Sequence, residues 1–385
     1  MRRFPFIVLI ILFSLACSCT QKHAAGTGTN ISIDPTKEGN ISIFDLISKV
    51  ELVQLEDLPE ALVAEETVKD IAVTEDGFLL LDRRTFFIRK FDRNGRFVML
   101  INKVGRGHGE FQRASAIQLD EDSTLLVLQA TGGITRYDLR DDITFVEQIP
   151  IEGGPRAVHH FVPIGGKRFL LFSASDPARL YLFDSGSGKS VPFFEDIPRW
   201  LSLSFYYDFQ ESPFYKRDGQ VFFYTGHDGA VFRLDATTSR MVPVLSWDLG
   251  PARFDPSDLT QEEASVTNPG WEDIFNQRSN HAVLRLSRVN ESARFVLASG
   301  VFKEQPISLV YDKKQRKGYA FRQVQEGVLY RPRFTNDEIA YTLLSPENVK
   351  KYVTREMIQD ANSQHVFDAL NDYSNSIIVK YYWKQ

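Results

Sequence analysis

The residues best suited to chemistry stand together in a glycine-rich segment, residues 105–110, which reads GRGHGE. Glycine-rich loops bind phosphate where their backbone N–H groups open a helix and a Lys followed by Ser or Thr comes next. Here Phe111 and a strand-like run follow instead. We therefore interpret the segment as a tight turn in which Glu110 accepts backbone N–H hydrogen bonds. For His108 two interpretations stay open, as a ligand-binding or as a structural residue.

Other reactive side chains are scattered along the chain. None of the seven histidines shows the local spacing of a metal site. They are His23, His108, His159, His160, His227, His281 and His365. The sequence contains no Gly-x-Ser-x-Gly motif and no serine with an identifiable base. It predicts no cofactor and no metal, and a metal held by ligands from distant segments is the weaker alternative.

A repeated pattern positions these residues. An aromatic or aliphatic residue followed by Asp recurs five times along the sequence. The aspartates are Asp92, Asp138, Asp184, Asp235 and Asp312. They are 46, 46, 51 and 77 residues apart, and a turn sequence precedes each of them. The longest interval corresponds to one ordinary period with an insertion within residues 251–280.

Each repeat has the composition of four short antiparallel strands. In residues 70–111, runs of Val, Ile, Leu and Phe are separated by turns such as Asp76-Gly77 and Asn94-Gly95. These dipeptides accept the positive φ angles of tight hairpins. A period in the forties with four strands is typical of a β-propeller. The alternative, a β-sandwich plus a second domain, explains neither the even spacing nor the recurring turn and aspartate.

We predict an all-β fold, a six-bladed β-propeller over residues 41–385. Five blades are visible as repeats, and the sixth is assembled from residues 328–385 and the N-terminal strand 50–55. Pairing that strand with the C-terminal strand 376–382 closes the ring and removes two exposed edges. Short helical insertions are expected near 255–280 and 346–361, and the fourth blade is expected to begin near Ser204.

Loops on one face of a propeller surround the central channel and are the expected ligand site. They connect second to third strands, and each outer strand to the next blade. In this chain they carry charges of both signs, which can hold a sugar, a peptide or a carboxylate by convergent hydrogen bonds. The candidate ligand-binding residues are Arg83, Arg84, Arg106, His108, Glu110, Arg179, His227, Asp228 and Lys303. The same loops carry Arg113, Arg156, Asp176 and Glu304.

Four aromatic residues precede the predicted fourth blade or open it. They are Trp200, Phe205, Tyr206 and Tyr207. They are equally consistent with a platform for sugar rings and with the core of a blade.

The N-terminus has the features of an export signal. Arg2 and Arg3 precede an apolar run over residues 4–16, which is too short for a transmembrane helix and ends in small residues. The segment FSLACSC resembles the lipobox of bacterial lipoproteins, in which the cysteine after the cleavage site is lipidated. Cys19 is favoured over Cys17 because cleavage there leaves no free thiol, and cleavage without lipidation is the alternative. Residues 1–19 are thus a predicted lipoprotein signal, and the mostly polar residues 20–40 a flexible tether.

Composition narrows the compartment and the partners. The 385 residues carry a net charge of -5, which provides no basic surface for nucleic acid. The only cysteines are Cys17 and Cys19, so the fold uses no disulfide. In some Gram-negative lipoproteins, an acidic cluster after the lipidated cysteine marks export to the cell surface. No such cluster follows Cys17 or Cys19. We therefore expect a lipid-anchored protein at the periplasmic face rather than the cell surface, with the anchor as its only membrane contact.

Residues 91–111, FDRNGRFVMLINKVGRGHGEF, support a closer comparison. They resemble a hallmark of the six-bladed β-propeller lipoproteins of Gram-negative gut anaerobes, relatives of NHL-repeat and TolB-like propellers. The hallmark is Phe-Asp, an Asn-Gly turn, an outer strand and Gly-x-Gly-Pro-Gly-Glu-Tyr/Phe; His108 stands where Pro is usual. The ending NDYSNSIIVKYYWK is similar to the family's final strand, with Asn375 matching its Asn-Pro opening and Ser376 departing from it. The resemblance implies the fold, a lipoprotein location and ligand binding, with no defined reaction.

Two functions are consistent with these observations. The favoured one is a non-catalytic binding or scaffold module, tethered at the cell envelope beside glycan or peptide uptake machinery. Its partner would be a small molecule, a glycan, a peptide or an envelope protein. The alternative is a propeller lyase or hydrolase of sugars or lactones that uses a metal or an Asp/Glu/His set at the channel mouth. The sequence shows no recognisable acid–base or metal constellation, which favours the first.

Overall fold

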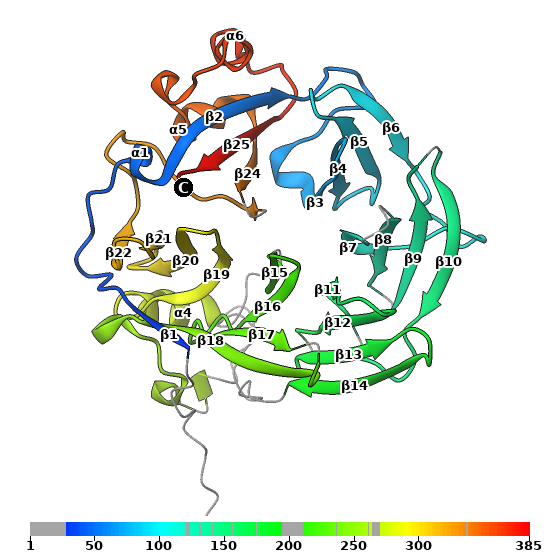
Figure 1. The fold of residues 1–385 in the computed structure, drawn as a ribbon, viewed down its shortest axis with the longest axis horizontal. Helices are drawn as coiled ribbons and strands as arrows, with labels where there is room; N and C mark the ends of the chain where they lie inside the picture. Colours follow the sequence, from blue (N-terminus) through cyan, green and yellow to red (C-terminus); the bar gives the residue numbers. More distant parts are fainter. Residues whose placement is uncertain are drawn as a thin grey trace, which may run out of the picture.

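The computed structural model shows six sheets arranged around a central axis (Figure 1). The structure describes residues 28–120, 124–130, 132–140, 142–155, 157–174, 176, 178–194, 211–235, 237–260, 262–263, 270–335 and 338–385. Each sheet contains four antiparallel strands that follow one another along the chain, except at the ring closure and at one added edge strand. The predicted six-bladed β-propeller is therefore confirmed.

In the first five blades the chain runs from the inner strand to the outer strand. Blades 1 to 3 are β3 (Val68–Val73), β4 (Gly77–Asp82), β5 (Ile88–Asp92) and β6 (Phe97–Ile101); β7 (Ala114–Leu119), β8 (Thr124–Gln129), β9 (Gly133–Asp138) and β10 (Thr144–Pro150); β11 (His160–Pro163), β12 (Arg168–Phe172), β13 (Leu180–Asp184) and β14 (Lys189–Phe194). Blades 4 and 5 are β15 (Phe214–Arg217), β16 (Gln220–Tyr224), β17 (Val231–Asp235) and β18 (Arg240–Asp248); β19 (Leu284–Glu291), β20 (Phe295–Phe302), β21 (Gln305–Asp312) and β22 (Lys317–Phe321). The inner strand expected from Ser204 lies outside the described residues, and the described inner strand of blade 4 is β15.

The recurring aspartates have a structural role in the turns between third and outer strands. Each ends its third strand and accepts a hydrogen bond through Oδ1 from a backbone N–H two or three residues later, at 2.8 to 2.9 Å. The acceptors are Asp92, Asp138, Asp184, Asp235 and Asp312. Such Asx turns reverse the chain, and four of them also contain a residue with positive φ, at Gly95, Gly188, Ser239 and Arg316. The spacing of these residues therefore reports the blade period and not a binding site.

The sixth blade joins the two ends of the chain. It consists of β23 (Phe334–Thr335), β24 (Ile339–Leu344), β25 (Ile377–Trp383) and, as its outer strand, β2 (Ile47–Gln54). In the antiparallel pair of β2 and β25, Val50 lies opposite Tyr381 and Leu52 opposite Val379. This confirms the predicted closure by the N-terminal and C-terminal strands.

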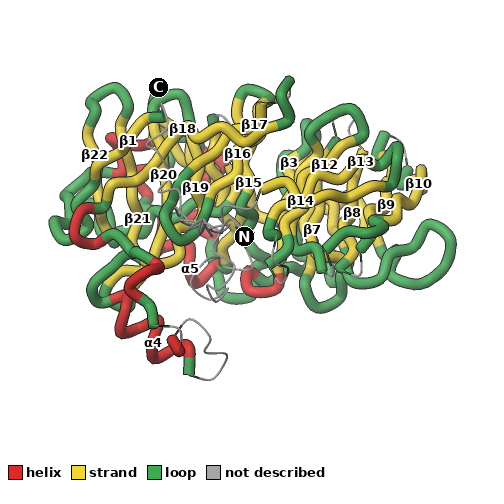
Figure 2. The backbone as a smooth tube through the Cα atoms, turned by 90° about the horizontal axis from the view of Figure 1, so that it is seen from below, coloured by secondary structure: helices red, strands yellow, loops and turns green. Residues whose placement is uncertain are grey.

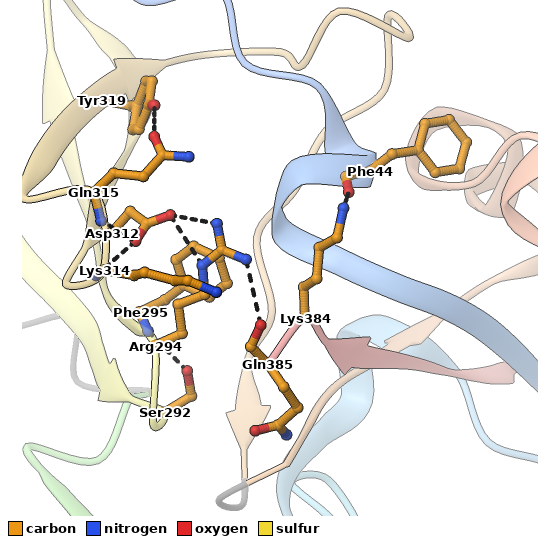
Figure 3. A network of polar contacts seen from close by, with 10 residues as sticks. All are labelled: Phe44, Ser292, Arg294, Phe295, Asp312, Lys314, Gln315, Tyr319, Lys384 and Gln385. Atoms are coloured by element: carbon orange, nitrogen blue, oxygen red, sulfur yellow. Dashed lines mark hydrogen bonds and ion pairs between the residues drawn. The ribbon is translucent and has the colours of Figure 1, made fainter.

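The C-terminal residues are also bound to blade 5 and to the N-terminal segment (Figure 3). Arg294 Nη2 lies 2.7 Å from Asp312 Oδ2, and its Nη1 donates to the carbonyl of Gln385. Lys384 Nζ donates to the carbonyl of Phe44 at 2.9 Å, within the short helix α1 (Ile43–Leu46). The ring is thus closed by strand pairing and by polar contacts at the same junction.

Helical segments interrupt the ring at the two predicted positions. The first insertion contains η2 (Gly250–Ala252), η3 (Pro256–Asp258) and α4 (Trp271–Ser279), which lies on the lower side of the disc in Figure 2. The second contains α5 (Pro346–Tyr352), η4 (Arg355–Met357) and α6 (Ala361–Ala369). The second insertion continues past the predicted end at 361, because Asp360 caps a further helix by accepting the backbone N–H of Ser363. A further short 3-10 helix, η1 (Glu65–Thr67), precedes blade 1.

The segment expected to be a tether contains a strand. β1 (Thr29–Ser32) pairs in parallel with β18 and becomes the fifth strand of blade 4. Ile31 is fully buried and Ile33 is 4% exposed, so these apolar residues within a polar stretch attach the chain to the blade. The predicted flexible tether over residues 20–40 is therefore wrong for this part, and residues 1–27, with both cysteines, lie outside the described residues.

The core lies between neighbouring blades. Between blades 1 and 2, for example, Leu79 and Ile88 pack with Ile117 and Val127, and all four are fully buried. Sheets that pack face to face through apolar side chains give each blade two buried faces. In the described part of the chain, every helix is too short or too polar to span a bilayer.

Candidate functional site

The main cavity of the described structure lies on the propeller axis and has a volume of about 560 Å³. Residues of the inner strands β3, β7, β11, β15, β19 and β23, one from each blade, form its wall (Figure 1). Turns between first and second strands, at Thr74 and Asp218, contribute to its rim. The cavity therefore extends toward the face opposite the loops that the sequence indicated.

The cavity wall carries polar side chains, charged or hydrogen-bonding, from every blade. They are Asp70, Thr74, Gln118, His160, Glu211, Ser212, Lys216, Arg217, Asp218, Arg288, Asn290, Arg333 and Thr335. Apolar residues such as Phe161 and Phe214 complete the wall. A concave site with convergent polar groups is the usual form of a small-molecule site.

Two arginines and one glutamate form the most constrained part of this wall. Glu211 Oε1 lies 3.0 Å from Arg288 Nη2 and 3.2 Å from Arg333 Nε. The glutamate side chain is 8% exposed, and those of Arg333 and Arg288 are 16% and 27% exposed. Glu211 precedes β15 of blade 4, Arg288 lies in β19 of blade 5, and Arg333 precedes β23 of blade 6. The two ion pairs therefore connect blades 4, 5 and 6 at the channel.

The backbone of Arg288 is held in an uncommon conformation. Its φ angle is 52°, in the left-handed region, and the pairing of β19 with β20 shifts register twice around Ser287. The N–H of Arg288 donates to the hydroxyl of Tyr224 at 3.1 Å instead of to the neighbouring strand. β-Bulges and strained residues gather at functional sites because they redirect a side chain at a cost in stability. The bulge directs the Arg288 side chain toward Glu211 and the cavity.

Asp70 also lies in the wall, in blade 1, which adjoins the blade of Arg333. Its Oδ2 accepts the N–H of Ile117 from blade 2 at 2.9 Å, and its Oδ1 accepts the N–H of Ile71. Burial raises the pKa of this carboxyl group to about 6, although these hydrogen bonds and the charges of Arg333 and Lys69 act in the other direction. Asp70 is thus a connection between two blades that also faces the cavity.

At the turn side of the cavity, the charges form ion pairs. Arg217 contacts Asp218 at 3.3 Å and also pairs with Glu291, which in turn lies 2.8 Å from Lys313. Burial lowers the pKa of Lys313, although the hydrogen bond that it donates to Glu291 raises it. These residues surround the rim between blades 4 and 5.

The structure places the candidates from the sequence in the predicted loops, away from the cavity wall. Arg83 and Arg84 follow β4, His227 and Asp228 lie between β16 and β17, and Lys303 follows β20. None of the nine candidates lines the cavity. Arg156 and the aromatic residues Trp200, Phe205, Tyr206 and Tyr207 lie outside the described residues. Ligand binding by the nine candidates remains a prediction.

Several of these candidates take part in local structure. Glu110 Oε2 accepts the N–H of Gly107 at 2.7 Å, which is the turn interaction that the sequence indicated. His108 packs edge-on against the ring of Phe145 at 4.6 Å. Asp228 accepts the hydroxyl hydrogen of Thr225 and lies 3.5 Å from Nε2 of His227. Arg179 Nη1 donates to the carbonyl of Ala174.

Sequence reasoning missed Glu211, Arg288, Arg333 and Asp70. For Asp70 and Arg288 the available signal was a charged residue within an inner strand, as in VKDIAV and LRLSRVNE, whereas Glu211 and Arg333 precede their strands. In an inner strand such a residue can satisfy its charge only at the channel, because the neighbouring blades cover both faces. Among the residues that the structure describes, no group of three or more His, Cys, Asp or Glu is arranged for a metal ion.

Comparisons with known proteins agree with this architecture. A family model described as a domain of unknown function (DUF4934) matches residues 29–382. The crystal structure of a protein from Bacteroides fragilis, described as exported, has a TM-score of 0.73 with 18% identity, and the match covers 93% of this chain and 100% of that chain. This likeness shows the fold alone. No curated protein has significant similarity to the sequence.

Two extracellular domains of signalling proteins from B. thetaiotaomicron match less well. The domain of a one-component system has a TM-score of 0.37 with 12% identity, and the match covers 71% of this chain and 29% of that chain. The domain of a hybrid two-component system has a TM-score of 0.39 with 13% identity, with 77% of this chain and 34% of that chain covered.

Proposed function

The chain belongs to the DUF4934 family, and we propose that it is an exported ligand-binding propeller that holds a small polar molecule in its central cavity. The observation that carries the proposal is the cavity of about 560 Å³ lined by charged or hydrogen-bonding side chains from all six blades. This volume lies within the range of small-molecule sites, roughly 300–1,000 Å³. Inner strands fixed between neighbouring blades provide a rigid wall, which lowers the entropic cost of binding.

We place the protein at the cell envelope, with a lipid on Cys19 or Cys17 as its anchor and the periplasmic face as its location. The described fold begins with β1, so only about nine residues separate Cys19 from the edge of blade 4, a reach of about 30 Å. Such a short connection favours a propeller held close to the membrane surface. The ligand would then be a glycan or peptide fragment that passes through the envelope, beside uptake machinery.

A ligand screen with paired variants tests the location of the site. Thermal-shift measurements with oligosaccharides and peptides identify a ligand, and calorimetry gives its affinity. Gln118→Trp adds bulk to the cavity wall, and Arg84→Ala with His108→Ala alters the loop face. We expect binding to be lost in the first variant and kept in the second. The reverse result would place the site on the loop face and refute the proposal.

The second hypothesis, a lyase or hydrolase of sugars or lactones, has one observation in its favour. Asp70 faces the cavity with a pKa raised to about 6, and such groups are common among catalytic acids and bases. Both oxygens of Asp70 accept backbone N–H groups, however, which favours a structural role. Turnover of the ligand identified above, lost in Asp70→Asn, would favour the enzyme.

A further inference from the structure

The cavity wall carries an excess of positive charge where blades 4, 5 and 6 meet. Among the described residues, two guanidinium groups, Arg288 and Arg333, contact the single carboxylate of Glu211. These three side chains together carry a net charge of +1, and the carboxyl group of Asp70 in blade 1 is close enough for the charge of Arg333 to act on it. We propose that the ligand of the cavity carries a carboxylate, bound jointly by Arg288 and Arg333, which rests on the proposed function and names the chemical class of the ligand.

The exposure of the three side chains supports this assignment. Glu211 is 8% exposed, whereas Arg333 is 16% and Arg288 is 27% exposed. All three residues line the cavity, and the carboxylate of Glu211 is the least exposed of the three charged groups. An arginine that served only to neutralise Glu211 would not need a second arginine on the same oxygen.

The strained backbone of Arg288 is a second, independent observation. The left-handed φ of 52° and the flanking register shifts exist at a position where an ordinary strand would have been more stable. Tyr224, whose hydroxyl accepts the N–H of Arg288, fixes this conformation. The Nε and Nη2 groups of Arg288 both donate to Glu211 Oε1, at 3.2 and 3.0 Å, which also fixes the plane of the guanidinium group. A planar cation held in this way favours a planar carboxylate.

One further cation lies within electrostatic reach of the cluster. Arg331 donates to the carbonyl of Pro306. Burial is the main cause that lowers the pKa of Arg331; the charges of Arg288 and Arg322 act in the same direction and Tyr352 acts in the opposite one. An anionic ligand offsets the positive charge of Arg288 and Arg333, and the planar guanidinium groups match the two oxygens of a carboxylate.

Arginine side-chain NMR provides a direct test. Protein labelled with ¹⁵N-arginine would be titrated with glucuronate and, as its neutral counterpart, glucose. The Nε–H signals of Arg288 and Arg333 are assigned from Arg288→Lys and Arg333→Lys. We expect glucuronate to shift both signals and glucose to shift neither, and each lysine variant, which keeps the charge but loses the planar donors, to bind at least about tenfold more weakly.

Glu211→Gln distinguishes binding from structure. If the arginines serve only the fold, this variant loses stability and its affinity for glucuronate does not rise. If they bind a carboxylate, removing the competing negative charge raises the affinity for glucuronate several-fold even where the melting temperature falls. No shift with glucuronate, an equal shift with glucose, or tighter binding of sulfate would each overturn the carboxylate assignment. If the protein binds a neutral ligand and Gln118→Trp abolishes that binding, the carboxylate assignment is wrong but the proposed function is still supported.

Discussion

Asn375 connects the two ends of the chain, and its replacement tests how the ring is closed. Its Oδ1 accepts the N–H groups of Val63 and Ser376 at 2.9 and 2.8 Å. Its Nδ2 donates to the carbonyls of Glu56 and Ala61 at 2.8 and 2.9 Å. The residue is 3% exposed and immediately precedes β25, while its partners Glu56 to Val63 follow β2.

The expected cost of Asn375→Ala follows from these contacts. Each lost hydrogen bond costs about 1 kcal/mol, and unpaired buried partners add to this, so the free energy of unfolding should fall by about 4 kcal/mol. That is a large share of a total near 5–15 kcal/mol. For a domain of roughly 350 residues, the melting temperature should fall by about 5 °C.

Asn375→Asp is the sharper variant. It keeps the acceptor but places an oxygen against the carbonyls of Glu56 and Ala61. We therefore expect a larger loss of stability than for Asn375→Ala at pH 7, because an unpaired buried charge is added to the lost bonds. Asn371→Ala, in the same exposed loop, is the control and should change the unfolding free energy by less than about 1 kcal/mol.

Urea unfolding followed by tryptophan fluorescence measures all three variants, since Trp383 lies in β25. The reasoning would be refuted by an Asn375→Ala protein within about 1 kcal/mol of the parent, or by an aspartate variant that is more stable than the alanine variant.

Three further outcomes are expected. Asp312→Ala breaks a buried pair with Arg294 (Figure 3) and should cost about 3–5 kcal/mol in urea unfolding, whereas Asp138→Ala, at a half-buried position with an exposed arginine partner, should cost less. The pKa of Asp70 rises from 3.8 to about 6 on folding, so this residue contributes stability that is present below pH 3.8 and lost as the pH rises through 6, about 3 kcal/mol in all. The difference in unfolding free energy between the parent and Asp70→Asn should therefore change over pH 4–7. A constant difference would contradict the raised pKa. Ile31→Asp should detach β1 and admit protease near residues 29–40 while the propeller stays folded, whereas Ser32→Asp, at an exposed position, should remain resistant.

The fold was predictable because its determinants are local and repeated. The turn aspartates and the Asp-Gly and Asn-Gly dipeptides each act within a few residues, so their spacing reveals the blades without any long-range information. The closure followed from edge strands, since an unpaired strand at each chain end requires a partner. The exact end of the second insertion depended on the capping by Asp360, which a pattern of apolar residues does not reveal.

The cavity residues could not be predicted in the same way. Whether an inner-strand residue faces the channel depends on register, and the bulges around Arg288 change that register within one strand. Glu211 precedes its blade, so nothing in its local sequence connects it with Arg333, more than one hundred residues later. The strand β1 was missed for a related reason: two isoleucines in a polar segment are significant only once the edge of blade 4 is known to be open.

The proposed site and the closure of the ring depend on each other. Arg333 contacts Glu211 in one direction and, through Nη1, donates to the carbonyl of Val68 in blade 1 in the other. Arg333 therefore connects the last blade with the first, and the hydrogen bonds of Asn375 stabilise the same junction. A ligand that binds the closed ring and not the open chain adds its binding free energy to the closure. A carboxylate bound by Arg288 and Arg333 would therefore stabilise the junction where the two chain ends meet.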